Sequence, residues 1–529
     1  MKLFPLHPPS PSRRRALVTP LATALAMVFP AWATASDATS DREQRTLQIV
    51  APWEVNGLQP ASSGFIFTRM QVAETLIDTD NDGGIKPGLA TSWRVSDDGL
   101  TWFFELRPNA RFHDGTPVTA EATLPSLKAA RVDPAVLSLA PIEAIEARGT
   151  HTVVIRLKSR YGSLPSLLAH SSTIILAPSA QDASGKVSQI VATGPYRIDT
   201  LTPPQQLTTV RFDRYDGQQP AIARTRYLAA GRAETRALMA ESGQADIAYT
   251  LDPASLKRIG TNGRLQVESA TLPRTTILKL NAGLPALKDV RVRRALSMAI
   301  DRKGIATALL RDPELAASQL FPPSLPQWFD ARLEPLGHDP AGARRLLAEA
   351  GWTKDAQGKL RNEKGEALAL TLRTFPDRPE LPTIATALQA QWREMGIDIK
   401  VNIGNSGDIP LGHRDGTLEL GLAARNYGTL PDPSAALAQD FSPEGGDWGA
   451  MGWHSPVLDE ALGRLLSGTV PETEQAGLRH RISAVLQDEL PIIPISWYRQ
   501  QAAVGQRVQQ VSIDPFERSY RITDMRWRP

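Results

Sequence analysis

A strand, a helix and a second strand follow one another in the second half of the chain, and this order limits the fold most. Residues 368–373 alternate in the manner of a strand, residues 383–395 have helical periodicity and end at Gly396, and residues 397–403 return to a strand pattern. Two strands joined through a helix form a parallel pair with the helix on one face of the sheet. The sequence therefore predicts an α/β fold.

Helix signals continue on both sides of this unit. Residues 291–303 carry apolar side chains at helical spacing, which predicts one helix with a buried face. Asp339 followed by Pro340 predicts a helix start, because an aspartate accepts hydrogen bonds from free backbone amides and proline fits the first helical position. The same reasoning places a helix start at 455–456, and residues 478–486 are expected to be helical.

The first half of the chain carries strand signals instead. Residues 47–50, 151–157 and 209–213 are rich in apolar and β-branched side chains. Residues 89–106 alternate around a turn at 97–99, where Gly99 supplies the positive φ of a tight hairpin turn. We expect these segments to form sheets.

The chain of 529 residues contains no cysteine. Disulfide bonds, zinc–thiolate sites, iron–sulfur clusters and thiol nucleophiles are therefore excluded. The same composition removes the cysteine through which an exported protein can be anchored to lipid. At about 100–200 residues per domain, the chain is expected to contain several domains, each with its own core.

Residues 1–35 have the composition of a secretory signal. Three arginines at 13–15 precede a mostly apolar run over 16–32, and small residues lead to Ala35, after which we expect cleavage. The arginines are similar to a twin-arginine signal, so the general secretory route and the twin-arginine route both stay open. A membrane anchor is the alternative, but the run is short for a span of about 20 residues. We expect a soluble protein of the Gram-negative periplasm.

The charge balance argues against a nucleic-acid partner. The chain has 59 Lys and Arg against 56 Asp and Glu, a formal net charge of +3. Four of the basic residues lie within residues 1–35, which contain no acidic residue, so the remainder is close to neutral. A basic surface for phosphate groups is therefore not expected.

Two patterns bear on metal binding. Residues 78–83 are similar to the beginning of a calcium loop, but the glutamate required at the twelfth position is Leu89, so we expect a solvated hairpin turn. The eight histidines include no close ligand pair, which predicts no metal cage formed by the protein alone and no bound cofactor. A single histidine could complete the coordination of a chelated metal, and His454 and His170 are the candidates.

Enzyme motifs are missing from the sequence. It has no nucleophile elbow, no phosphate-binding glycine loop and no dinucleotide fingerprint. No pair of carboxylates is placed by its spacing for acid–base catalysis. We expect no enzymatic activity, with a periplasmic hydrolase as the alternative from another class.

Several short motifs occur in a fixed order along the chain. They lie at residues 87–93, 96–102, 112–117, 193–196, 290–296, 299–302, 338–352, 431–433 and 490–494. Together they resemble the signature of extracytoplasmic solute-binding proteins of the peptide/nickel type (family 5), which deliver ligands to ABC importers. The resemblance implies a monomer that binds a small molecule, uses no nucleic acid and works with an inner-membrane permease and its cytoplasmic ATPase.

The resemblance also implies an α/β fold of two lobes that close on the ligand. The implied bounds are 45–276 with 498–529 for lobe I, 89–190 for an inserted subdomain within it, and 277–497 for lobe II. Two chain crossings, near 279–281 and 496–498, would form the hinge.

Residues 424–433 bear on the choice of ligand. In peptide-binding relatives an aspartate at the position of Thr429 pairs with the α-ammonium of the peptide, because an ammonium buried without a counter-charge costs several kcal/mol. Thr429 is neutral, and the nickel-chelate relatives also lack this acid. Their Arg–x–aromatic–Gly pattern is similar to residues 425–428. Their chelate-holding basic residues have no clear counterpart here, where Ser172 and residues 445–446 take their place.

The predicted ligand is therefore a nickel-type metal chelate or another small anionic solute, with a di- or oligopeptide as the alternative. Arg425 could bind a ligand carboxylate in bidentate fashion, or form an ion pair within lobe II. Aromatic side chains often line such sites, although each could equally belong to a core. The predicted ligand-binding residues are Arg425, Tyr427, Thr429, Trp448 and Trp53.

Overall fold

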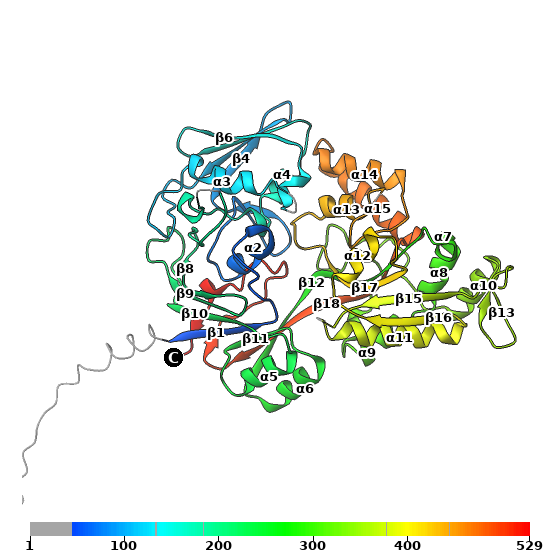
Figure 1. Cartoon of the computed structure of the whole chain (residues 1–529). Helices are drawn as coiled ribbons and strands as arrows, with labels where there is room; N and C mark the ends of the chain where they lie inside the picture. The colour runs from blue at the N-terminus through cyan, green and yellow to red at the C-terminus, as the bar shows by residue number, and fades with distance from the viewer. Residues whose placement is uncertain (1–44, 133–134, 183–184, 377, 444) are drawn as a thin grey trace, which may run out of the picture. The chain divides into compact units, whose positions relative to one another are not determined.

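The largest element of the fold is a mixed sheet of ten strands (Figure 1). A computed structural model describes residues 45–132, 135–182, 185–376, 378–443 and 445–529; the predicted signal sequence and its cleavage site at Ala35 lie outside these residues. The strands follow in the order β16 (Asp398–Ile403), β15 (Ala369–Thr374), β17 (Leu420–Asn426), β12 (Leu265–Leu280), β18 (Ile492–Gly505), β11 (Ile247–Tyr249), β1 (Thr46–Ala51), β10 (Arg224–Ala229), β9 (Gln206–Arg211) and β8 (Tyr196–Thr202).

Two long antiparallel strands, β12 and β18, connect the two halves of this sheet. One half continues from β12 through β17, and the other continues from β18 through β11. The pairing of β12 with β18 shifts register between Leu272 and Thr275, opposite Tyr498 and Trp497. The irregularity lies near residues 497–498 in β18 and at 272–275 in β12, and the predicted crossings near 279–281 and 496–498 stay predictions, as do the lobe bounds.

The predicted strand–helix–strand unit is confirmed. Strands β15 and β16 are parallel, and α11 (Glu380–Met395) connects them. The helix begins three residues before the predicted start and ends at Gly396, whose φ of 93° is in the left-handed region. Trp392 of α11 is fully buried in the core against this half of the sheet. The α/β class follows from this unit together with the mixed sheet.

The predicted single helix over 291–303 is wrong, because the chain forms two helices there. They are α8 (Val290–Met298) and α9 (Arg302–Ala308). The Asp301 side chain accepts a hydrogen bond from the Gly304 amide and so begins a new helix where the apolar spacing alone predicts continuation.

The other helix starts are confirmed. The Asp339 carboxylate accepts from the Gly342 amide at 2.8 Å, and Pro340 opens α10 (Pro340–Glu349). Pro456 opens α14 (Pro456–Ser467), and residues 478–486 lie within α15 (Glu472–Glu489). The same part of the chain contains α7 (Pro285–Lys288), α12 (Asp408–Arg414), α13 (Ser434–Asp440) and the short pair β13 (Thr353–Lys354) and β14 (Leu360–Arg361).

A separate four-stranded sheet lies in the first half of the chain. Its order is β4 (Ala90–Val95), β5 (Thr101–Leu106), β7 (Thr152–Leu157) and β6 (Ile142–Arg148). The predicted hairpin is confirmed, with Gly99 at a φ of 73° in its turn. The predicted strands at 47–50 and 151–157 correspond to β1 and β7, whereas the one at 209–213 is displaced, because β9 ends at Arg211. Helices α3 (Ala120–Ala129) and α4 (Leu164–Leu167) accompany this sheet.

The acidic residues 78–83 form a hairpin between β2 (Ile77–Thr79) and β3 (Ile85–Pro87), as predicted. One carboxylate oxygen of Asp80 accepts from the amides of Asp82 and Gly84, which satisfies the turn without a cation. The remaining elements are α2 (Pro60–Arg69), α5 (Ala233–Glu241), α6 (Pro253–Asn262), β19 (Val508–Gln509), β20 (Arg526–Trp527) and short 3-10 turns that include Ser171–Thr173.

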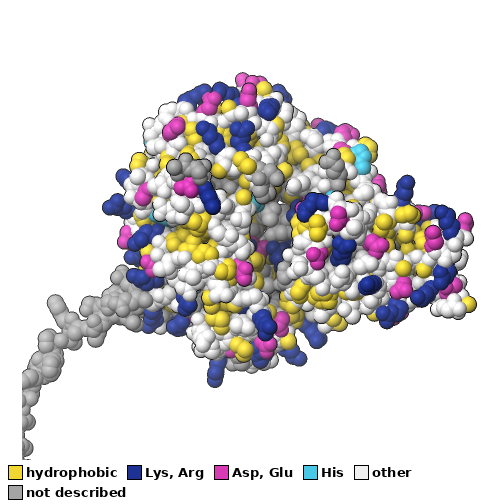
Figure 2. All heavy atoms as spheres, in the orientation of Figure 1, with side chains coloured by type: hydrophobic (Ala, Val, Ile, Leu, Met, Phe, Trp, Pro, Cys, Tyr) yellow, Lys and Arg dark blue, Asp and Glu magenta, His cyan; other side chains and the backbone are white. Residues whose placement is uncertain are grey.

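Basic and acidic side chains are interspersed on the face shown in Figure 2.

Candidate ligand-binding site

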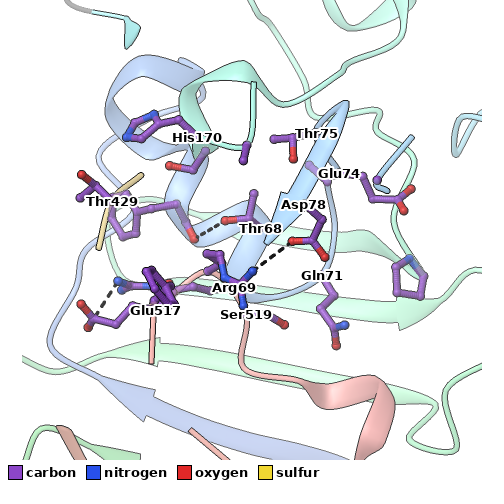
Figure 3. A pocket seen from close by; sticks show the side chains of 18 of the residues that line it. Thr68, Arg69, Gln71, Glu74, Thr75, Asp78, His170, Thr429, Glu517 and Ser519 are labelled. Carbon is purple, nitrogen blue, oxygen red and sulfur yellow. Dashed lines mark hydrogen bonds and ion pairs between the residues drawn. The ribbon is translucent and has the colours of Figure 1, made fainter. Parts of the chain in front are cut away.

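A cavity of about 320 Å³ lies where segments from both halves of the main sheet meet. Most of its wall comes from α2, the β2–β3 hairpin and residues 169–171 and 516–519. Asn426 and Thr429, at the end of β17, supply the wall on the other side of the β12–β18 pair. Figure 3 shows the wall residues at close range.

Two glycines allow the wall segments to approach each other closely. A Cβ on Gly64 of α2 would lie 2.1 Å from the Ser171 carbonyl oxygen, and one on Gly194 would lie 2.3 Å from the Gln71 carbonyl oxygen. No side chain fits at either contact, so glycine is required for α2 and its following loop to pack as they do. This packing places Arg69 and His170 in one wall.

At one end of the cavity the wall residues Glu74 and Arg107 form an ion pair, and Arg107 also pairs with a second carboxylate, Asp216, which does not line the cavity. Arg107 Nη2 donates to Glu74 at 3.0 and 3.1 Å and pairs with Asp216 at 3.2 Å, and the Tyr215 hydroxyl donates to Glu74 at 3.1 Å. Burial raises the pKa of Glu74, and the charge of Arg107 opposes this effect only in part. This end carries an excess of one carboxylate.

The other end is basic and centres on Arg69 and Glu517. Arg69 Nε donates to the Glu517 carbonyl at 2.8 Å, and the guanidinium lies over the Trp53 ring, 4.2 Å from its centroid. Only 8% of Arg69 is exposed. Figure 3 shows Arg69 and Glu517 together, with Glu74 on the opposite side of the view.

His170 presents one defined ring nitrogen to its surroundings. The Ser172 amide donates to its Nδ1 at 3.1 Å, and the Ser172 hydroxyl lies 2.9 Å from the same atom. Burial lowers the pKa of His170 to about 4, so the ring is neutral near pH 7. Because Nδ1 accepts, the proton of the neutral ring resides on Nε2, for which the described residues provide no hydrogen-bond partner.

Three of the predicted residues belong to this site. Thr429 and His170 line the cavity, and Thr429 is exposed there. Trp53 reaches the site through its contact with Arg69. The His170 ring is arranged as a donor and not as a metal ligand, because a lone pair on Nε2 would require the proton to be on Nδ1.

The other four predicted residues lie away from the cavity wall. Arg425 donates to both carboxylate oxygens of Asp440, at 2.6 and 2.9 Å, which is the ion pair within one half that the sequence allowed. Tyr427 is buried against Phe321, and burial raises the pKa of its hydroxyl. The other two are Trp448, which packs edge-on against Phe375, and His454, which is exposed and paired with Asp459.

Sequence reasoning missed Arg69, Glu74, Arg107 and Glu517. Arg69 occupies the last turn of a helix, where a cation is favourable next to the helix dipole, so its presence gave no sign of a ligand. Its contact to Glu517 spans 448 positions in the chain. No local pattern marks such a pair.

No group of three or more metal-ligating side chains occurs within the residues that the structure describes. The same residues contain no helix that is long and apolar enough to cross a membrane.

A sheet in two halves, joined by two strands, with a polar cavity where the halves meet, defines a protein that holds a small solute between two lobes. The chain belongs to the bacterial extracellular solute-binding proteins, family 5, whose middle region matches residues 84–448. Members of this family are the ligand-binding components of ABC importers and act with a permease and an ATPase.

Relatives with known names agree with this assignment. The nickel-binding periplasmic protein of Escherichia coli is 29% identical over 468 residues, which are 85% of this chain and 89% of the relative. The probable D,D-dipeptide-binding periplasmic protein of the same organism is 28% identical, covering 75% of this chain and 76% of its own. The crystal structure of NikA from Brucella suis in complex with Fe(III)-EDTA has the same fold, with a TM-score of 0.80, 24% identity and coverage of 91% of this chain and 100% of that one.

Proposed function

We propose that this protein captures a small anionic solute, free or as a metal chelate, and delivers it to its permease. The supporting observation is an imbalance in the cavity wall. Each wall carboxylate already has a basic partner: Glu74 has Arg107, Asp78 has Lys86 and Arg518, and Glu517 has Arg274 and Arg69. The donors His170 Nε2 and Arg69 Nη1, by contrast, have no acceptor within the described residues. A solute rich in acceptor oxygens would satisfy them.

The chemistry of His170 and Thr429 favours oxygen atoms of a ligand over its metal. The Nε2 proton of His170 can be donated to a carboxylate oxygen, and the Thr429 hydroxyl can donate as well. A metal would therefore be bound through its chelator, whose outer oxygens these side chains contact. The nickel-binding relative and the neighbour in complex with Fe(III)-EDTA are consistent with such a ligand.

A di- or oligopeptide is the second candidate, favoured by one observation. Glu74 and Asp216 share Arg107, so an ammonium group at this end of the cavity would compensate the second carboxylate. The dipeptide-binding relative supports this possibility. Thr429, on the opposite wall, supplies no carboxylate for it.

The remaining parts of the proposal concern place and mode of action. We propose that the protein is exported to the periplasm, acts as a monomer and releases its solute chemically unchanged. The periplasmic names of the relatives support the location. Mass spectrometry of the solute recovered after prolonged incubation would reveal a hydrolase by the appearance of a product.

The ligand class can be tested by thermal unfolding of the mature protein. A ligand at 100 times its Kd adds about 2.7 kcal/mol to the free energy of unfolding, which is readily measured. We expect stabilisation by citrate or by Fe(III)–EDTA, and none by Ala-Ala or Ala-Ala-Ala. Stabilisation by the peptides alone would establish the second candidate instead.

Closure of the lobes can be tested independently. We propose lobe I as residues 45–276 with 498–529 and lobe II as residues 277–497, with bending at the β12–β18 pair. Because the cavity wall comes from both, the closed form would bind the solute better. Small-angle scattering should show a smaller radius of gyration with the stabilising ligand than without it.

A further inference from the structure

Four charged side chains from distant segments meet beside the cavity. They are Arg69 of α2, Arg274 of β12, Arg378 before α11, and Glu517. Arg274 Nη2 pairs with Glu517 Oε2, and Arg69 Nη2 lies 3.6 Å from Glu517 Oε1. The guanidinium carbons of Arg274 and Arg378 lie 4.9 and 5.2 Å from the centroid of one ring, that of Tyr498. We call these four residues the arginine cluster.

The arginine cluster has more positive than negative charge. Three guanidinium groups face the carboxylate of Glu517, and Glu380, which acts on Arg378, is the second carboxylate nearby. Burial would raise the pKa of Glu517, but the three guanidiniums together hold it below its ordinary value. The pKa of Arg274 is lowered by burial and by its like-charged neighbours, and the charge of Glu517 offsets this only in part. One further carboxylate would balance the charges.

The arginine cluster also has unused hydrogen-bond donors. Arg274 is 4% exposed and Arg69 is 8% exposed. Arg274 Nε and Nη1 and Arg69 Nη1 are buried and lack an acceptor in the part of the chain that the structure describes, and Glu517 Oε1 is a buried acceptor that lacks a donor there. A buried donor without a partner costs about 1–3 kcal/mol, so an acceptor oxygen placed beside these three donors would be stabilised by them.

We propose that the arginine cluster is an oxyanion subsite that takes one carboxylate group of the solute. Arg69 and Glu517 form part of the cavity wall, whereas Arg274 and Arg378 do not line it, so a ligand carboxylate would reach the cluster from the basic end of the cavity, past Arg69 and Glu517. The planar guanidinium fork matches a carboxylate, and the ligand group joins Glu517 as the partner of Arg69 and Arg274. Glu517 then limits the subsite to one anionic group, because a second one would meet its charge. This inference rests on the proposed function and names the group recognised.

If the arginine cluster binds a carboxylate, two substitutions within it should change the affinity for that carboxylate in opposite directions. Arg274→Met removes donors while keeping an apolar stem, and we expect it to weaken binding of citrate or Fe(III)–EDTA about tenfold or more. Glu517→Gln removes the competing charge and keeps the side-chain shape, and we expect severalfold tighter binding of the same probe. A folding defect cannot produce tighter binding, so the second variant stays informative even if the first is unstable.

The experiment is isothermal titration of the mature protein and these variants with citrate, Fe(III)–EDTA and inorganic phosphate. Arg425→Gln is the control, because Arg425 is partly buried and paired with Asp440 away from the cavity wall. The affinity of this variant for each probe should equal that of the unchanged protein. Inorganic phosphate should bind more weakly than the carboxylates, because its second negative charge would be repelled by Glu517.

The possible failures can be told apart. Equal carboxylate affinity in the unchanged protein, Arg274→Met and Glu517→Gln would overturn the subsite while the proposed function stands. Binding of peptides, but of neither citrate nor Fe(III)–EDTA, by the unchanged protein would overturn the proposed function. The subsite would fall with it if Arg274→Met bound those peptides equally well, because a peptide also carries a terminal carboxylate. Binding of phosphate in preference to every carboxylate would overturn the assignment of the group.

Discussion

His113, in the segment between β5 and α3, and His170, in the cavity wall, are two histidines whose second ring nitrogens have different surroundings. In both, a backbone amide donates to Nδ1, from Ala192 to His113 and from Ser172 to His170, and burial lowers the pKa to about 4. His113 Nε2 lies 3.0 Å from the Gly194 carbonyl oxygen, whereas the described residues offer no acceptor to His170 Nε2. The pKa is lowered to about 4 in both, so a structural histidine differs from a candidate binding residue in the completeness of its hydrogen bonds and in its position relative to the cavity wall.

The arginines repeat this contrast. Arg425 is matched one to one with Asp440, while Arg274 shares Glu517 with Arg69. The sequence pattern pointed to Arg425, and the structure directs attention to Arg274. A side chain whose partners are complete holds the fold, and one with open donors next to the cavity can bind an acceptor of a ligand.

The largest expected effect is on the free energy of unfolding, when the ion pair of Arg425 with Asp440 is broken. Asp440→Asn leaves the Arg425 guanidinium buried without a counter-charge, and the free energy of unfolding should fall by about 3–5 kcal/mol in urea denaturation. The exposed pair of Arg414 with Asp447 is the control, and Asp447→Asn should cost at most about 1 kcal/mol. Similar losses in the two variants would contradict the view that Arg425 is held for stability.

The next effect is the pH dependence of stability. His170 titrates near 4 in the folded protein and near 6.5 when unfolded, so the unfolded state binds more protons between these values. Stability should therefore be lost as the pH falls from about 6.5 to 4, by about 3 kcal/mol for this group at most. His170→Asn, whose carbonyl can accept from the Ser172 amide, should reduce the slope of unfolding free energy against pH over this interval.

His113→Asn should change that slope by a similar amount, since the pKa of His113 is lowered to about 4 as well. An unchanged slope in both variants would show that neither ring is kept neutral by burial.

The same two variants should differ in ligand binding, with a smaller effect. His170→Asn removes one neutral donor from the cavity wall, and the affinity for a stabilising carboxylate should fall about two- to tenfold in titration calorimetry. His113→Asn should leave the affinity unchanged, because the His113 ring lies outside the wall. Equal affinities in the two variants would remove His170 from the site.

The smallest expected effect is that of a substitution at Thr429, at the rim of the cavity. Thr429→Asp adds a charge at an exposed position, so the free energy of unfolding should change by no more than about 0.5 kcal/mol. Binding of a carboxylate probe should weaken by about two- to fivefold through repulsion, and less at high salt. Thr429→Asn is the neutral control, and tighter binding of Fe(III)–EDTA by the aspartate variant would contradict an anionic ligand.

Elements governed by near neighbours could be predicted from the sequence. The cap from Asp339 to Gly342 spans three residues, and the end of α11 at Gly396 depends on one backbone angle. The break at Asp301 was missed because apolar spacing continues through it, while one carboxylate decides the new helix start. The α/β class was predictable for the same local reasons.

The site was only partly predictable, because its charges are paired over long distances. Arg274 and Glu517 are 243 positions apart, and Arg69 and Glu517 are 448 apart. The sequence suggested Thr429 and His170 as single residues, but it could not show that Arg425 has Asp440 as its partner. Which arginine keeps hydrogen-bond donors without an acceptor depends on the tertiary structure.

The register shift in β12 has a mechanical consequence. Strands β12 and β18 join the two halves of the sheet, and their pairing is interrupted between Leu272 and Thr275. A paired strand bends most readily at such an irregularity. Arg274 lies inside this interruption. A rotation of one half of the sheet against the other would therefore bend β12 at the residue that carries this guanidinium. Bending of the strands and binding of an anion would then involve the same residue.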